Sequence, residues 1–140
     1  MEQPDPTPLQ GVFEAALYVD DLDAAEAFYG QALGLERINR AGNRHVFYRV
    51  GQTILLIFNP AETEVSNPDA RLPVPPHGAR GPGHLCFAAS APQIDRWQRR
   101  LEKAGYPAEA RFHWPNGALS LYLRDPAGNS IEFAERSLWF

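Results

Sequence analysis

The sequence repeats its own pattern at an offset of about 70 residues, and this internal duplication limits the fold more than any other feature. Glu14, near the start of the first half, corresponds to His84 in the second half. The helix-ending Gly34 corresponds to Gly105 within one residue. Each half reads as strand, helix, strand, strand, strand, so the chain predicts an α+β protein made of two similar units.

In the first half, apolar periodicity and capping residues mark the elements. Asp20 or Asp21 caps a helix of about twelve residues that ends at Gly34. Short turn-forming connections separate the three strands that follow, which favours antiparallel hairpins. The strands expected in this half span residues 13–19, 35–40, 44–50 and 53–59.

The second half repeats this arrangement after a proline-rich crossover. Ser90 caps a helix with Pro92 in its first turn. We match Phe47-Tyr48 of the first half with Leu121-Tyr122 of the second. The expected strands span residues 84–89, 107–114, 118–124 and 130–135. We therefore expect one domain over 1–140, with module one at about 11–60, a crossover loop at about 61–83 and module two at about 84–136.

Composition excludes several classes of partner and location. The formal charge of −4 and the pI near 5.5 argue against a nucleic-acid or anionic-membrane surface. The single cysteine excludes an intrachain disulfide and fits a reducing compartment. The polar, proline-rich first eight residues lack the apolar segment of a secretory signal, and no apolar run is long enough to span a bilayer. We therefore expect a cytoplasmic protein.

One face of each sheet carries chemistry because the helices must cover the other, more apolar face. The strand at residues 130–135 follows the sharp turn Asp125–Asn129 and turns Glu132 away from its apolar neighbours. On the equivalent face of the two first strands lie Glu14 and His84, beside small residues that leave room for a bound group. Two such curved sheets would enclose a cup.

Glu14, His84 and Glu132 together form a set with metal-ligand chemistry. One imidazole and two carboxylates suit a divalent ion such as Zn, Ni, Co, Mn or Fe, whose identity the residues leave open. Taken singly, His84 also fits a hydrogen-bonded histidine at a strand end, and each glutamate fits a solvated strand position.

Four segments resemble the vicinal oxygen chelate superfamily, which includes glyoxalase I, bleomycin-resistance proteins and extradiol dioxygenases: Leu17–Tyr29, Leu33–Leu35, Gly83–Phe87 and Leu123–Phe133. The resemblance implies two tandem βαβββ modules whose mixed sheets form a cup-shaped cleft, commonly in a homodimer. It also implies a metal ion held by one residue at the start and one at the end of each module. Those positions are Glu14, His84 and Glu132 here.

The fourth position departs from that pattern. The residue that matches Glu132 in module one is Leu56 or Phe58, depending on how the Asp125–Asn129 turn is aligned, and both are apolar. Glyoxalase I uses four protein ligands, and extradiol dioxygenases use two histidines and one carboxylate. The chain therefore matches neither site completely.

Two functions follow from this resemblance. The first is a metal-dependent lyase or isomerase, or less readily a dioxygenase, that acts on a small substrate with vicinal oxygens and uses Glu132 and Glu14 catalytically. The alternative is a metal-free protein that binds a small molecule or antibiotic, as bleomycin-resistance proteins do. In either case, the candidate pocket residues are Tyr18, Tyr48, Cys86, Trp114 and His77.

Overall fold

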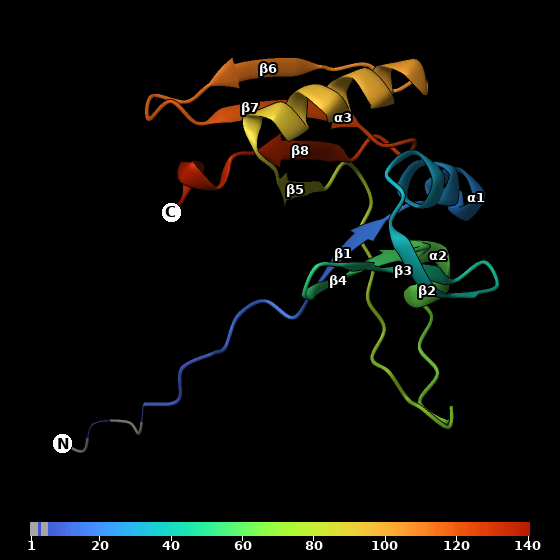
Figure 1. The fold of residues 1–140 in the computed structure, drawn as a ribbon. Helices are drawn as coiled ribbons and strands as arrows, with labels where there is room; N and C mark the ends of the chain where they lie inside the picture. Colours follow the sequence, from blue (N-terminus) through green and yellow to red (C-terminus); the bar gives the residue numbers. More distant parts are fainter. Residues whose placement is uncertain (1–2, 4–5) are drawn as a thin grey trace.

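Two four-stranded mixed sheets, one from each half of the chain, form the framework of the protein (Figure 1). The computed structural model describes residue 3 and residues 6–140. Met1, Glu2, Pro4 and Asp5, which belong to the polar N-terminal segment, lie outside the described residues. The sheets are accompanied by few helices, so the expected α+β class with two similar modules is confirmed.

The same strand order occurs in both sheets. The first sheet has the order β1-β4-β3-β2, and the second has the order β5-β8-β7-β6. The parallel pairs are β1 with β4 in the first sheet and β5 with β8 in the second. All other neighbouring strands are antiparallel. The bounds are β1 Glu14–Tyr18, β2 Glu36–Ala41, β3 His45–Val50, β4 Thr53–Phe58, β5 His84–Ala88, β6 Ala110–His113, β7 Leu119–Arg124 and β8 Ser130–Ala134.

The first helix differs from the regular helix that the sequence predicts. Asp21 is its cap and accepts a hydrogen bond from the backbone of Ala24 at 3.0 Å, but only α1, Leu22–Ala25, is α-helical. The continuation η1, Glu26–Ala32, is a π-helix. Its wider turns accommodate two consecutive, fully buried aromatic side chains, Phe28 and Tyr29.

The second helix agrees with the prediction. Helix α3, Ala91–Lys103, begins with a capping box in which Ser90 and Gln93 bond to each other's backbone. It lies across the second sheet in Figure 1, with Ile94 and Leu101 buried. Two short helices, α2 (Pro60–Thr63) and η2 (Arg136–Leu138), complete the elements, and residues 64–83 run without strand or helix. No helix in the described part of the chain is long and apolar enough to cross a membrane.

Strand register corrects one match between the modules. In the first sheet Phe47 pairs with Leu56, and in the second Tyr122 pairs with Glu132. Because Ala16 pairs with Leu56 as Cys86 pairs with Glu132, Phe47 is the counterpart of Tyr122. The sequence match of Phe47-Tyr48 with Leu121-Tyr122 was wrong by one residue, and a one-residue slip exchanges the two faces of a strand.

A buried turn between β7 and β8 joins the two modules. The Tyr29 hydroxyl in module one donates to the Asp125 carboxylate at 2.7 Å. The Asn129 side chain donates to the Tyr18 carbonyl at 3.1 Å and accepts from the Gly83 amide at 2.8 Å. Burial and the Asp125 charge raise the pKa of Tyr29 well above its ordinary value, so the phenol keeps the proton that it donates.

We predict that Asp125→Ala lowers the free energy of unfolding by about 2–4 kcal/mol, because several buried donors lose their acceptor at once. Asp125 accepts from Tyr29, from Ala127 and from both the backbone and side chain of Asn129. Urea denaturation followed by circular dichroism measures the change. Asp69→Ala, in the exposed crossover loop, is the control, and equal losses in the two variants would contradict the prediction.

Candidate functional site

Glu132 on β8 is a buried carboxylate with a fixed orientation. The residue is 5% exposed, and its Oε2 accepts a hydrogen bond from the Ser120 hydroxyl at 2.6 Å. Ser120 in turn accepts from the indole nitrogen of Trp114 at 2.8 Å. This chain of bonds satisfies one carboxylate oxygen and leaves Oε1 available on the strand face.

His84 on β5 points one ring nitrogen at that remaining oxygen. Its Nε2 lies 3.2 Å from Oε1 of Glu132, and the side chain is 51% exposed. Its Nδ1 lies 3.1 Å from the backbone oxygen of Ser130. Because a carbonyl oxygen only accepts, Nδ1 carries the proton in that contact and Nε2 is directed toward Glu132.

Two protonated side chains flank the Glu132 carboxylate. Cys86 and Tyr122 pair with Glu132 on the neighbouring strands β5 and β7. Although Cys86 as a residue is exposed, desolvation of its thiol and the neighbouring Glu132 raise the pKa of Cys86 to about 12. The same two causes raise the pKa of Tyr122 to about 12. Both groups therefore stay neutral near pH 7, so the thiol is a poor nucleophile and the phenol is a hydrogen-bond donor.

Aromatic rings extend the site along the second sheet. The Tyr122 ring stacks with His84 at 6.2 Å and with Phe112 at 5.7 Å between centroids. Phe112 also contacts Trp114 edge-on at 4.9 Å. Sequence reasoning found Trp114 but missed Ser120, Phe112 and Tyr122. Strict alternation along β7, in which Leu119, Leu121 and Leu123 are buried on the core face, was the signal that identifies Ser120 and Tyr122.

Glu14 lies on the other sheet, at the start of β1, and is exposed. No three histidine, cysteine or carboxylate side chains come together as a metal-binding group within the described residues of one chain. His84 and Glu132 are therefore brought together, and Glu14 is not. Register also decides the fourth position, because Leu56 pairs with Ala16 as Glu132 pairs with Cys86.

The other candidate pocket residues of module one separate into two places. The Tyr18 hydroxyl and His77 Nδ1 lie 2.6 Å apart, and the His77 ring packs on Phe58 at 4.6 Å between centroids. The crossover loop thus contributes to the open face of the first sheet. Tyr48, by contrast, is 1% exposed and belongs to the hydrophobic core beside Tyr29. The one-residue slip in matching the modules explains why Tyr48 was expected on the open face.

His84 and Glu132 fit a divalent metal ion as a pair of ligands. Two ligand atoms of a tetrahedral site with bonds near 2.1 Å lie roughly 3.4 Å apart, which is close to the separation of Nε2 and Oε1. Ligating histidines commonly donate their other N–H to a backbone carbonyl, as the Nδ1 contact with Ser130 does here. One chain supplies two ligands, so a complete site needs a further donor.

A cavity of about 460 Å³ lies between residues of the two modules, and neither His84 nor Glu132 lines it. It runs between the β3–β4 turn of module one and β5 of module two, and Cys86 and Arg136 are among its lining residues. That volume is typical of sites for small molecules. The cavity reaches the second sheet at Cys86, the strand neighbour of Glu132.

Known proteins are similar to this chain in sequence and in fold. The profile of the Glyoxalase/Bleomycin resistance protein/Dioxygenase superfamily matches residues 11–133. The chain belongs to this superfamily. The superfamily's two-module fold agrees with the two sheets described above, and its members bind small-molecule substrates.

Individual relatives span nearly the whole chain. The crystal structure of lactoylglutathione lyase from Agrobacterium tumefaciens is 46% identical, with a TM-score of 0.89 over 95% of this chain and 98% of that one. Virulence protein STM3117 of Salmonella typhimurium is 32% identical, over 85% of this chain and 79% of its own length. A glyoxalase-related enzyme from Fulvimarina pelagi, 24% identical with a TM-score of 0.71 over 94% of this chain and 92% of its own, shares the fold.

We predict that Glu132→Gln makes Cys86 alkylate several-fold faster with iodoacetamide near pH 9. The negative carboxylate disfavours the thiolate, so removing its charge lowers the pKa of Cys86 from about 12, while burial keeps it above the ordinary value. Mass spectrometry reports the rate cleanly because the chain has one cysteine. Glu102→Gln on α3 is the control, and an unchanged rate in Glu132→Gln would refute the expected coupling.

Proposed function

We propose that the protein is a metal-dependent lyase or isomerase of this superfamily that acts on a small substrate with vicinal oxygens. The observation that carries the proposal is the approach of His84 Nε2 to within 3.2 Å of Oε1 of Glu132, a buried carboxylate whose other oxygen is hydrogen-bonded to Ser120. The 46% identity to a protein named lactoylglutathione lyase supports the lyase class. Lactoylglutathione is therefore the first compound to test.

In this proposal His84 and Glu132 hold the ion, and Glu14 from a second copy of the chain completes its protein ligands in a homodimer. Glu14 is exposed and far enough from the pair that a single chain does not assemble all three. The residues before it, Val12 and Phe13, are 79% and 81% exposed. Large exposed apolar side chains of this kind are typical of surfaces that a partner covers.

A bound divalent ion supplies Lewis-acid polarisation of the substrate oxygens. When it is released from the ion, Glu132 Oε1 is the atom that would take up or return a proton, because Ser120 already occupies Oε2. The neutral Tyr122 phenol offers a hydrogen bond to a substrate oxygen without adding charge beside Glu132. Phe112 and Trp114 form an aromatic wall that limits access of water.

Module one of the second copy provides the opposite wall in this arrangement. Tyr18 lies on the same strand face as Glu14, four residues further along β1, with Ala16 midway between them. His77 is fixed against Tyr18 and Phe58 by the contacts described above. We propose that this hydrogen-bonded pair contacts the substrate, together with Cys86 and Trp114 of the first copy.

A metal-free binding protein is the second candidate, and the apolar fourth position favours it. Leu56 occupies the place of Glu132 in module one, and aromatic rings surround it. Two of these rings, Phe47 and Phe58, lie 5.5 Å from each other between centroids. Such a face suits an aromatic or cationic ligand. If the protein binds its ligand without a metal, the ligand should quench tryptophan fluorescence equally in the presence of a chelator.

We predict that the purified protein binds about one divalent ion per chain and that His84→Ala and Glu132→Ala abolish this binding, because each removes one of two fixed ligands. Elemental analysis after metal loading and gel filtration measures it, and Glu109→Ala, an exposed carboxylate on the same module, is the control. Absence of stoichiometric metal, or unchanged metal in Glu132→Ala, would overturn the metal-dependent function.

Mixing variants tests the contribution of a second copy. Glu14→Ala and Glu132→Ala chains are unfolded together and refolded. Random assortment makes about half of the two-fold dimers mixed, and each mixed dimer has one intact site out of two. We therefore expect the refolded mixture to bind about a quarter of the metal that the wild-type protein binds. If Glu14→Ala alone keeps full metal content and full lactoylglutathione turnover, then Glu14 is not a ligand.

A further inference from the structure

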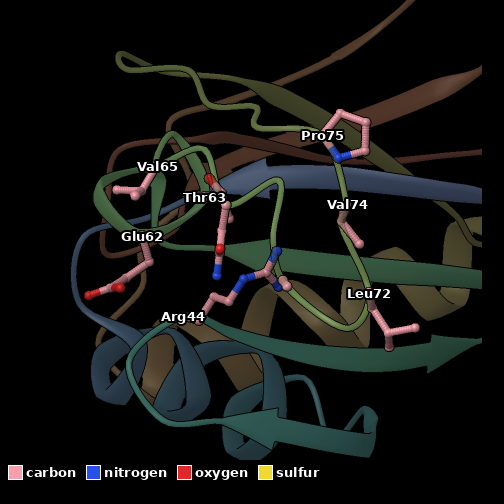
Figure 2. A pocket seen from close by; sticks show the side chains of 9 residues that line it. Arg44, Glu62, Thr63, Val65, Leu72, Val74 and Pro75 are labelled. Atoms are coloured by element: carbon pink, nitrogen blue, oxygen red, sulfur yellow. The ribbon is translucent and has the colours of Figure 1, made fainter.

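A second pocket, separate from the His84–Glu132 pair, lies under the crossover loop (Figure 2). Its volume is about 440 Å³, within the range of sites for small molecules. It is bounded by the start of β3, by α2 and by the crossover loop, which returns over both. The lining residues are Arg44, Glu62, Thr63, Val65, Asn67, Ala70, Leu72, Val74 and Pro75.

Arg44 is the one cation among these lining residues, and its side chain is held in place. Its Nη1 donates to Nδ1 of His45 at 2.7 Å, and its guanidinium lies 5.6 Å from the Phe58 ring centroid. No carboxylate in the described part of the chain forms an ion pair with Arg44. Glu62, the acidic residue of the pocket, points away from the guanidinium in Figure 2. The remaining donors of Arg44 are therefore available to a ligand.

Hydrogen bonds between three chain segments fix the walls around Arg44. The Asn59 side chain donates to the Asn43 carbonyl at 3.1 Å, which ties the end of β4 to the β2–β3 turn. The same side chain caps α2 by accepting from Ala61 at 3.1 Å. The crossover loop is anchored where the His77 amide donates to the Thr63 carbonyl at 2.9 Å. The pocket is thus built by the fold.

Apolar side chains surround the cation and remain open to solvent. Val65 is 66% exposed, Leu72 is 76% exposed and Val74 is 59% exposed. Figure 2 shows Leu72 and Val74 on the segment of the crossover loop that lies across the pocket from Arg44. A planar guanidinium binds a carboxylate through two parallel hydrogen bonds, and one guanidinium without a second cation suits a single negative charge better than a phosphate.

We propose that this pocket binds a small monocarboxylic acid with an apolar chain, whose carboxylate pairs with Arg44 and whose chain packs on Leu72 and Val74. The proposal does not depend on metal binding or on the lyase function, because neither His84 nor Glu132 lines this pocket. Hexanoate is the probe, since it joins one carboxylate to a short unbranched apolar chain.

Isothermal titration calorimetry compares hexanoate with hexan-1-ol and hexylamine on the full-length protein. We expect hexanoate to bind and the two analogues without a negative charge to bind at least tenfold more weakly, because they leave Arg44 unpaired. Equal binding of all three compounds, tighter binding of hexylamine, or no binding of hexanoate at millimolar concentration would overturn the proposal.

Two variants separate the head-group contact from the apolar contact. Arg44→Gln should weaken hexanoate binding at least tenfold, whereas Arg49→Gln, on β3 and outside the pocket, should leave it unchanged. Leu72→Asp should also weaken hexanoate, because a second negative charge repels the carboxylate. If Arg44→Gln binds hexanoate as tightly as the unaltered protein, the guanidinium does not bind the carboxylate and the proposal is wrong. Metal content stays unchanged in all these variants, so this test is independent of the metal assay.

NMR of His45 gives a second readout in the unaltered protein. Burial and the Arg44 charge lower the pKa of His45 below its ordinary value. A carboxylate that pairs with Arg44 compensates that charge, so saturating hexanoate should raise the pKa of His45, and hexan-1-ol should not. An unchanged titration of His45 at saturating hexanoate would place the ligand elsewhere and overturn the proposal.

Discussion

The fold depends on one buried turn, Asp125–Asn129, that bonds the two modules to each other. Asn129 uses both functions of its amide, donating to the Tyr18 carbonyl and accepting from the Gly83 amide, while Asp125 accepts from Tyr29. Buried polar groups persist when their partners are present, and here two of the partners, Tyr18 and Tyr29, come from the opposite module. The same turn starts β8, so the contact that joins the modules also sets the direction of Glu132.

Duplication produced two sheets of the same topology with different chemistry on their open faces. The second sheet carries a buried carboxylate whose Oε1 faces His84 and whose Oε2 is held by Ser120. The corresponding place in the first sheet is Leu56, among aromatic rings. A polar face and an aromatic face on equivalent scaffolds suit a substrate held between a reactive side and an apolar wall. Belonging to the glyoxalase superfamily fits that division without specifying the reaction.

The crossover segment contributes more than a connection between the modules. It brings His77 to Tyr18 on the open face of the first sheet, and it closes a pocket over Arg44. Both features rely on the Asn59 side chain and on the Thr63–His77 backbone bond, which hold the segment against α2 and the β2–β3 turn. A long proline-rich segment without regular structure thereby acquires a fixed course, because its ends are tied to sheet strands.

The sequence by itself determined the duplication and the order of elements along the chain, because periodicity is local. It also determined a helix cap at Asp20 or Asp21, a second cap at Ser90, and the shared strand face of Cys86 and Glu132. Tertiary structure alone decided the register, which sets Leu56 rather than Phe58 opposite Ala16 and moves Tyr48 into the core. It also decided the π-helical turn that buries Phe28 beside Tyr29, and the approach of the crossover loop to Arg44. These features depend on contacts between residues distant in sequence, and a one-residue shift in a turn, invisible in composition, exchanges the faces of a whole strand.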